Sequence, residues 1–348
     1  MNIIFRVDAS TEIGTGHVMR CITLAHFLKE KGAEISFICT EVSGNLIEYI
    51  REKEFNVYPI LEFSDFIEDA ELTIAILQKN KVDLVIVDHY KIDARWERAI
   101  KESINQIKLL IVDDLANREH DCDVLLDQNY FKEFENRYNA LVPVHCKKLL
   151  GPKYLLLRPE FYKTSKVEND LTERMDILIF YGGSDPTNET MKALKALDYI
   201  DTSKLNIHVV VGLSNVNHQH IEKICQKNNY HFYIQIDYLA QLMARADLAL
   251  GAGGVTMWER CFLGLPSIVT IVADNQLGST EAAAEFGAVW NMGWHEHVNI
   301  AKLVDIMNGA LAHPEKLAEI GQKAKLLMQS EEKLQTHPVV EAIMEVLT

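Results

Sequence analysis

MNIIFRVDASTEIGTGHVMRCITLAHFL, residues 1–28, contains the pattern from which the architecture of the whole chain can be predicted. It opens with the apolar run Ile3-Ile4-Phe5, crosses a segment rich in Ser, Thr and Gly, and continues with apolar residues at helical spacing, namely Val18, Ile22, Ala25 and Leu28. This predicts a strand, a loop and a helix, with His17 in the first turn of the helix. Backbone N–H groups at a helix start favour a bound anion, and glycine lets the anion approach them closely.

The alternation of strand and helix continues along the chain. Four further segments of the first half, AEISFICT, VDLVIVDHY, IKLLIVDDL and DCDVLLDQN, carry the continuous apolar runs typical of a parallel sheet. After a proline-containing, polar region without periodicity, the alternation restarts near Met175. We therefore predict an N-terminal Rossmann-like domain over 1–150, a linker over 151–174, a C-terminal Rossmann-like domain over 175–330, and a helix over 331–348 that could pack back on the first domain.

The composition of the 348 residues is that of a soluble protein with well-formed cores, at 48% hydrophobic and 24% charged residues. A net charge of −15 argues against a nucleic-acid or anionic-membrane surface, although a local cationic pocket can still bind a phosphorylated small molecule. There is no apolar run of membrane length and no signal-peptide pattern, so we expect a cytoplasmic protein. Six scattered cysteines without a CxxC pair predict neither a disulfide framework nor a zinc site.

Polar clusters follow several strands, and ligands of open parallel sheets bind at those strand ends. Gly14-x-Gly16-His17 lacks the third glycine of a dinucleotide fingerprint, because Met19 occupies that place, so a nicotinamide enzyme is only an alternative. Asp88-His89-Tyr90 offers proton carriers or hydroxyl contacts, or else a turn cap and a half-packed phenol. Asp113-Asp114 and Asp121-x-Asp123 suggest a metal, but paired acids at strand ends are more often solvated or capping.

Two clusters of the second half have the form of a tight turn before a helix, YGGSDPTN at 181–188 and GAGGVTMWE at 251–259. The glycines at 251, 253 and 254 leave the N–H groups before the predicted helix 256–263 open to a diphosphate. Glu259 lies one turn into that helix, where its carboxylate could accept from both ribose hydroxyls of a nucleotide or merely favour the helix start. The spacing favours a nucleotide.

The chain resembles a known family over roughly residues 1–295. The segments RVDASTEIGTGHVMRCITLA, VDHYKI, DDLANREHDCDVLLDQN, LLLRPEFY, YGGSDPTN and GAGGVTMWE to DNQ are similar, in order, to those of the UDP-2,4-diacetamido-2,4,6-trideoxy-β-L-altropyranose hydrolases of pseudaminic acid biosynthesis. These are nucleotide-sugar enzymes of GT-B type. The resemblance implies an α/β fold of two Rossmann-like, doubly wound domains that face each other across a cleft.

The activity that the resemblance implies is a metal-independent, inverting hydrolysis that releases UDP and the free sugar, without a cofactor. His17 is the expected general base, since an imidazole titrates near neutral pH. Asp8 could orient it and Tyr90 could position the water or a sugar substituent. The residues expected to bind UDP are Gly254, Val255, Thr256, Glu259, Gly183 and Ser184. Those expected near the sugar are Gly14, Gly16, Asn275, Gln276 and Asp88.

Two other functions are compatible with the same donor site. A GT-B glycosyltransferase would use an acceptor in place of water, and a nucleotide-sugar binding protein would not turn its ligand over. The partner expected in each case is a small-molecule UDP-sugar, with no nucleic acid and no membrane insertion. The sequence leaves the stereochemistry of the sugar and the oligomeric state open.

Overall fold

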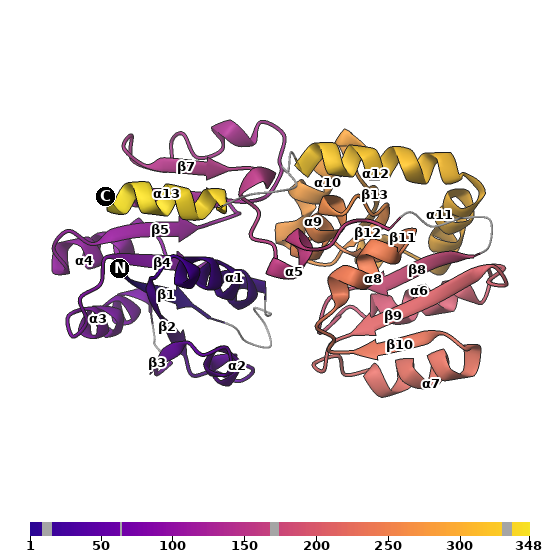
Figure 1. The fold of residues 1–348 in the computed structure, drawn as a ribbon, viewed down its shortest axis with the longest axis horizontal. Coiled ribbons are helices and arrows are strands. Elements are labelled where there is room, and N and C mark those ends of the chain that lie inside the picture. The colour runs from indigo at the N-terminus through magenta and orange to yellow at the C-terminus, as the bar shows by residue number, and fades with distance from the viewer. Residues whose placement is uncertain (9–15, 63–64, 168–173, 329–335) are drawn as a thin grey trace. The chain divides into compact units, whose positions relative to one another are not determined.

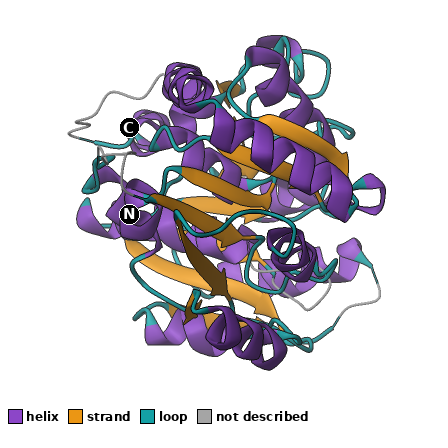
Figure 2. Ribbon diagram, turned by 90° about the vertical axis from the view of Figure 1, so that its right-hand side faces the viewer, coloured by secondary structure: helices purple, strands orange, loops and turns teal. Residues whose placement is uncertain are grey.

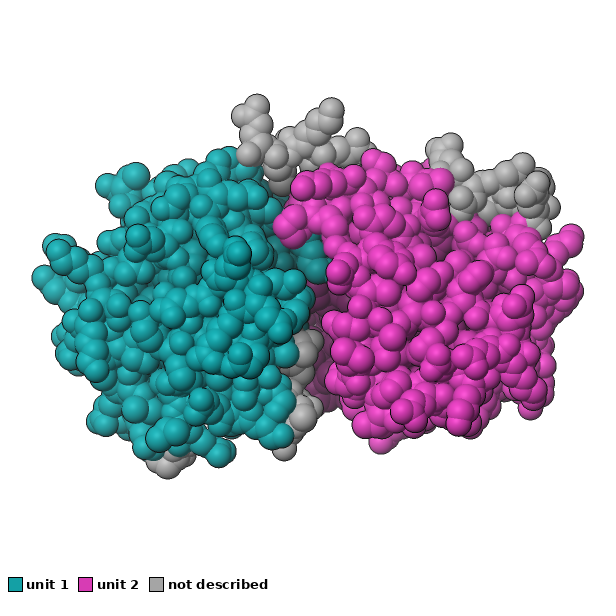
Figure 3. Space-filling view, turned by 60° about the horizontal axis from the view of Figure 1, so that its bottom comes forward, with its two compact units in different colours: residues 1–129, 133–158, 333–348 teal, residues 130–132, 159–332 magenta. Residues whose placement is uncertain are grey.

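The chain forms two compact units in a computed structural model (Figure 1), which describes residues 1–8, 16–62, 65–167, 174–328 and 336–348. Unit 1 comprises Met1–Asn129, Glu133–Arg158 and Lys333–Thr348, and unit 2 comprises Tyr130–Lys132 and Pro159–Glu332. Figure 3 distinguishes the residues of the two units by colour. The expected cleft between two domains stays a prediction.

Unit 1 is built on a parallel sheet of seven strands in the order β3-β2-β1-β4-β5-β6-β7. Its strands are β1 (Asn2–Val7), β2 (Glu34–Thr40), β3 (Asn56–Ile60), β4 (Leu84–Asp88), β5 (Lys108–Val112), β6 (Val124–Asp127) and β7 (Lys147–Leu150). Its helices are α1 (Gly16–Glu30), α2 (Ile47–Glu52), α3 (Phe66–Leu77), α4 (Ala94–Ser103), η1 (Phe134–Asn136), η2 (Pro152–Tyr154) and α13 (Pro338–Leu347).

The apolar run of β1 fills both faces of this sheet because successive side chains of a strand point to opposite sides. Ile3 and Phe5 belong to a core with residues of α1, α2 and α13. Ile4 belongs to a second core with residues of α3 and α4. The helices therefore cover both faces of this sheet, and β1 is buried along nearly its whole length. Figure 2 colours the helices of the chain purple and its strands orange.

The last helix, α13, belongs to unit 1, although it lies far from the rest of that unit in the sequence. Val339 and Ile343 join the core beside α1. His337 precedes the helix, accepts from the amide of Val339 through Nδ1 at 3.2 Å, and donates from Nε2 to the carbonyl of Leu155 at 3.0 Å. The carbonyl of Leu155 only accepts, so Nε2 carries a proton, whereas Nδ1 accepts from an amide and carries none. The imidazole is therefore neutral, and burial lowers the pKa of His337 to about 4.

Unit 2 repeats the architecture with six parallel strands in the order β10-β9-β8-β11-β12-β13. Its strands are β8 (Met175–Phe180), β9 (Leu205–Val211), β10 (His231–Ile234), β11 (Leu248–Ala252), β12 (Ser267–Ile271) and β13 (Trp290–Trp294). Its helices are α5 (Pro159–Tyr162), α6 (Glu189–Leu197), α7 (His218–Asn228), α8 (Leu239–Arg245), α9 (Val255–Phe262), η3 (Asp274–Gln276), α10 (Leu277–Phe286), η4 (His295–His297), α11 (Ile300–Ala312) and α12 (Pro314–Met328).

Both sheets reverse their strand order beside the first strand, between β1 and β4 in unit 1 and between β8 and β11 in unit 2. Loops on the two sides of such a reversal lead away in opposite directions and leave room for a ligand at the carboxyl ends. The predicted doubly wound architecture is confirmed. Within the described ranges, no helix has the length and apolar character needed to cross a membrane.

We predict that acid loosens α13 through His337. Its pKa is about 4 in the folded chain against about 6.5 in an unfolded one, so its contribution is complete above pH 6.5 and is lost as the pH falls toward 4. The loss amounts to about 3 kcal/mol of unfolding free energy in unit 1. Guanidinium unfolding curves at pH 7, 5.5 and 4.5 measure it.

The control is His337→Asn, which keeps a side-chain acceptor for the amide of Val339 but does not titrate. Its stability should be lower at pH 7, because the bond to Leu155 is lost, and should fall less between pH 6.5 and 4. An equal fall in both proteins would show that His337 does not carry the effect.

Candidate functional site

His17 lies in a cluster of charged side chains at the carboxyl ends of β1 and β4. It sits in the first turn of α1, as the sequence predicts, and is 8% exposed. Its Nδ1 is 2.5 Å from Oδ1 of Asp88, the last residue of β4, which is 1% exposed. Because β4 pairs with β1, the end of β4 lies beside the carboxyl end of β1.

The short contact between His17 and Asp88 defines the tautomer of the imidazole. A carboxylate oxygen has only lone pairs, so Nδ1 must carry the proton of this bond. In the neutral ring the lone pair is then on Nε2, which is the arrangement of a base oriented by a carboxylate. Burial alone would raise the pKa of Asp88, but Arg20 and His17 outweigh it and hold that pKa well below its usual range. Asp88 is therefore ionised at neutral pH.

Tyr90 closes the cluster on the other side of the imidazole. Its ring meets that of His17 edge to face, with 4.6 Å between centroids. Its hydroxyl donates to Oδ2 of Asp114 at 3.3 Å, and the same oxygen lies 3.4 Å from Nη1 of Arg20. The structure thus brings together His17 and Tyr90, two of the three residues predicted to act in catalysis.

The third, Asp8, does not orient His17, so that part of the prediction is wrong. Its carboxylate is held by Arg6 at 2.7 and 2.9 Å and accepts from the amide of Thr40 at 2.7 Å. It also lies 3.3 Å from Nε2 of His89. Burial alone would raise the pKa of Asp8, but Arg6 and His89 lower it well below its usual range. Asp8 belongs to a buried structural network.

Asp88, which is expected near the sugar, is almost fully buried. Both of its oxygens accept from Arg20, and one of them is shared with His17. Its contact with a sugar stays a prediction.

The acids for which a metal was the alternative all face cations of the protein. Asp113 pairs with Arg118 at 2.7 Å, Asp121 with Lys101 at 2.9 Å, and Asp123 with Lys108 at 3.0 Å. Asp114 faces Arg20. In the described parts of the chain, no three His, Cys, Asp or Glu residues are grouped in the manner of a metal site.

The glycine turn of unit 2 connects β11 to α9. Gly254 has a φ of 78°, a conformation that residues with a Cβ rarely adopt, and it precedes the helix that begins at Val255. A Cβ on Gly253 would come within 2.7 Å of Oγ1 of Thr280 and 3.0 Å of the Cβ of Gln276. Gly254, Val255 and Thr256 remain partly exposed, so the first N–H groups of α9 lie at an accessible surface.

Two charged residues of α9 are buried behind this turn. Glu259 is 3% exposed and lies one helical turn after Val255. Arg260 is 1% exposed and donates to neutral oxygens, the carbonyl of Ala252 at 2.7 Å and the hydroxyl of Ser267 at 3.1 Å. Burial lowers the pKa of Arg260 to about 10. Its bond to Ala252 fixes the backbone just before the glycines.

The remaining predicted residues of unit 2 lie at the same edge of its sheet. Gln276 accepts from the amide of Val272 through Oε1 at 3.1 Å, and its Nε2 lies 3.6 Å from the position that a Cβ of Gly254 would take. Asn275 is exposed beside it. Gly183 and Ser184 form the exposed tip of the turn after β8, the neighbour of β11. The predicted UDP residues are thus grouped at the switch point of the sheet.

Gly14 and Gly16 are the two glycines expected near the sugar. Gly16 is the first residue of α1 and is exposed, and a Cβ placed on it would meet no atom within 4 Å. Among the described residues, nothing occupies the space beside the Cα of Gly16, next to His17 in the sequence. Gly14 lies outside the described residues.

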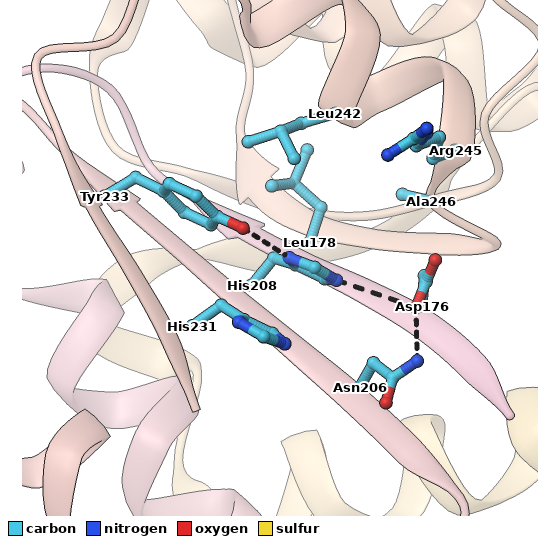
Figure 4. A pocket seen from close by; sticks show the side chains of 9 residues that line it. All are labelled: Asp176, Leu178, Asn206, His208, His231, Tyr233, Leu242, Arg245 and Ala246. Atoms are coloured by element: carbon cyan, nitrogen blue, oxygen red, sulfur yellow. Dashed lines mark hydrogen bonds and ion pairs between the residues drawn. The ribbon is translucent and has the colours of Figure 1, made fainter. Parts of the chain in front are cut away.

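A separate cavity of about 260 Å³ lies at the opposite end of the strands of unit 2 (Figure 4). Asp176, near the start of β8, accepts from Asn206 at 2.8 Å and lies 3.6 Å from Nε2 of His208. The His208 ring stacks on that of His231, with 4.7 Å between centroids. None of the predicted site residues lines this cavity, so it is separate from the predicted nucleotide site.

Residues that sequence reasoning missed are Arg20, Asp114 as a partner of Tyr90, and Asp88 as the partner of His17. Arg20 follows His17 by three positions, a spacing that places both on one side of a helix. The doubly wound strand order would have placed Asp88 next to β1. The helical spacing and the strand order were therefore the two features from which these contacts could have been predicted.

The comparisons with known proteins agree with this architecture. The family model of the glycosyltransferase family 28 C-terminal domain matches residues 177–337. MurG of Acinetobacter baumannii superposes with a TM-score of 0.67 over 99% of both chains at 16% identity. The predicted GT-B fold class is confirmed.

Two relatives define the family more narrowly. UDP-2,4-diacetamido-2,4,6-trideoxy-β-L-altropyranose hydrolase of Campylobacter jejuni is 32% identical over 248 residues, which cover 71% of this chain and 83% of that one. An uncharacterised protein of Methanocaldococcus jannaschii is 31% identical over 282 residues, 77% of this chain but only 55% of that relative. The chain belongs to the family of UDP-2,4-diacetamido-2,4,6-trideoxy-β-L-altropyranose hydrolases.

We predict that Arg6→Met lowers the unfolding free energy of unit 1 by about 3–5 kcal/mol, because Asp8 and Asp69 would remain as buried charges without their cation. Arg51→Met is the control, since Arg51 pairs with Glu48 on the exposed surface and should cost less than about 1 kcal/mol. Denaturant titration measures both. Equal losses would mean that the buried network is not needed for stability.

Proposed function

We propose that the chain hydrolyses a UDP-2,4-diacetamido-2,4,6-trideoxyhexose, the altropyranose in the first instance, to UDP and free sugar for pseudaminic acid biosynthesis. The observation that carries the proposal is the contact of 2.5 Å between Nδ1 of His17 and Asp88, which leaves Nε2 to receive a proton from water. The family supports the choice of substrate. Unit 1 supplies the base and unit 2 the residues for UDP.

In the proposed reaction, Nε2 of His17 takes a proton from water as the water oxygen attacks the anomeric carbon. The bond between that carbon and the β-phosphate oxygen breaks, and UDP leaves with the electron pair. Attack from the face opposite the leaving group inverts the anomeric centre. Tyr90 lies against the imidazole, where it can position the water or a sugar substituent.

The leaving diphosphate gains negative charge, and the start of α9 is suited to it. The N–H groups of Val255 and Thr256 and the positive end of the helix dipole stabilise an anion without a metal ion. Glu259 is proposed to accept from the ribose hydroxyls. Gly183, Ser184, Asn275 and Gln276 are proposed to contact the phosphates or the sugar.

The experiment that tests the reaction is hydrolysis of the UDP-diacetamido-sugar in ¹⁸O-labelled water with EDTA present. We expect UDP release, the heavy oxygen on the anomeric carbon and unlabelled UDP, read by mass spectrometry. Label on UDP would mean attack at phosphorus, and sugar transferred to another molecule would identify a glycosyltransferase, the alternative that the matched family 28 domain favours. Binding without UDP release would identify a binding protein. A panel of stereoisomers then defines the sugar.

We predict that His17→Asn lowers kcat by about 10²–10⁴-fold, because the proton acceptor is lost. The affinity for UDP, measured by calorimetry, should stay within about threefold of wild type. A variant with near-normal turnover would remove His17 from the mechanism.

Glu259→Ala is the matched control on the nucleotide side. It should weaken UDP binding by roughly 10–100-fold, the typical cost of a hydrogen bond to a charged group. A loss of kcat in His17→Asn and a loss of UDP affinity in Glu259→Ala would together distinguish the role of the base from that of the nucleotide contact.

A further inference from the structure

Arg20 contacts three residues of the cluster around His17, namely Asp88, Asp114 and His17 itself. It is 6% exposed on α1, one turn after His17. Its Nε and Nη2 donate to the two oxygens of Asp88 at 2.5 and 2.7 Å. Its Nη1 points to Asp114 at 3.4 Å. The guanidinium therefore lies between two carboxylates and next to the imidazole.

The fork of two bonds to Asp88 fixes the plane of its carboxylate. A single bond from His17 would leave that carboxylate free to rotate, whereas a bidentate guanidinium holds both oxygens. Held in this way, Oδ1 stays opposite Nδ1 of His17, so the imidazole keeps its Nδ1–H tautomer.

The charge of Arg20 acts on the imidazole as well. Asp88 by itself would favour the imidazolium, which has no lone pair for water. Nη2 of Arg20 lies 3.1 Å from Nδ1 of His17. Both nitrogens carry hydrogen, so the contact between them is electrostatically unfavourable. The repulsion becomes stronger when the ring gains a second proton and a positive charge. Arg20 thus opposes the effect of Asp88 on the protonation of His17.

The other groups that face this pair are few in the described structure. Tyr90 packs on the imidazole and bonds to Asp114. Sγ of Cys21 lies 3.6 Å from Asp88, and burial raises the pKa of this thiol, so it is neutral. The formal charges to be balanced are those of Asp88, Asp114 and Arg20.

We propose that Arg20 is a positioning residue for the hydrolysis: it clamps Asp88 and keeps His17 neutral, with Nε2 open to the proton of water. This inference rests on the proposed role of His17. Arg20 itself touches neither water nor sugar in this scheme.

The test compares the pH dependence of kcat/KM between pH 5 and 10 in wild type, Arg20→Met and Arg20→Lys. In Arg20→Met the acid limb should move up by about 1–3 pH units, because Asp88 and Asp114 then act on the imidazole without their cation. Its rate should be far lower than wild type at pH 7 and should rise by pH 9 to a plateau that stays below the wild-type one, because the fork to Asp88 is also lost. In Arg20→Lys the charge is kept and the fork lost, so the limb stays near its wild-type position with a lower plateau.

A rate reduced equally at all pH values, with the acid limb unmoved in Arg20→Met, would overturn the proposal in favour of a purely structural role. Arg95→Met removes an exposed cation of α4 and controls for the change in net charge. If Arg20→Met does not fold, Arg20→Gln against Arg20→Lys makes the same comparison of neutral and charged side chains.

Nitrogen NMR of the labelled imidazole of His17 makes the test independent of turnover. We expect the Nδ1–H tautomer in wild type and a midpoint of protonation that rises in Arg20→Met. If both proteins had the same midpoint and wild type still hydrolysed the UDP-sugar, the proposed role of Arg20 would be overturned and the proposed function would stand. A raised midpoint in a protein that hydrolyses no UDP-sugar would support the charge effect of Arg20 and remove the proposed function.

Discussion

The guanidinium of Arg6, buried near the carboxyl end of β1 in unit 1, makes the interaction on which the carboxyl edge of that sheet depends. It lies between two carboxylates, Asp8 at 2.7 Å and Asp69 at 2.5 Å. These connect β1 to α3, and Thr40 adds β2. Trp96 of α4 donates to Asp69 at 2.7 Å. A single buried cation thereby ties β1, β2 and both helices of one face together.

The network also determines which carboxylate forms the hydrogen bond with His17. Asp8 and Asp88 both end strands at the switch point, but Asp8 is committed to Arg6 and His89. Asp88 is left to Arg20 and His17. Each carboxylate is matched with one arginine, and in both cases the cation keeps a buried acid ionised. The orientation of the imidazole follows from this division.

The sequence predicted the elements well and the contacts between them poorly. Apolar runs such as Ile3-Ile4-Phe5 predict buried strands because burial on both faces needs apolar residues at every position. The partner of His17 could not be derived in this way, since it depends on which strand lies beside β1, a choice made by helix packing across the whole sheet. Arg6 interrupts an apolar strand, and its full burial could not be predicted from a charged residue at that position.

Buried arginines serve the two units differently. Arg6 and Arg20 are each balanced by two carboxylates, so their positive charge is compensated inside unit 1. Arg260 donates instead to the hydroxyl of Ser267 and the carbonyl of Ala252, just before the glycines, and burial depresses its pKa. Its guanidinium places positive charge close to the turn in front of α9, and the carboxylate of Glu259 acts on it there. Under the proposed function this is the required asymmetry, because a base must stay neutral whereas a departing diphosphate needs positive potential.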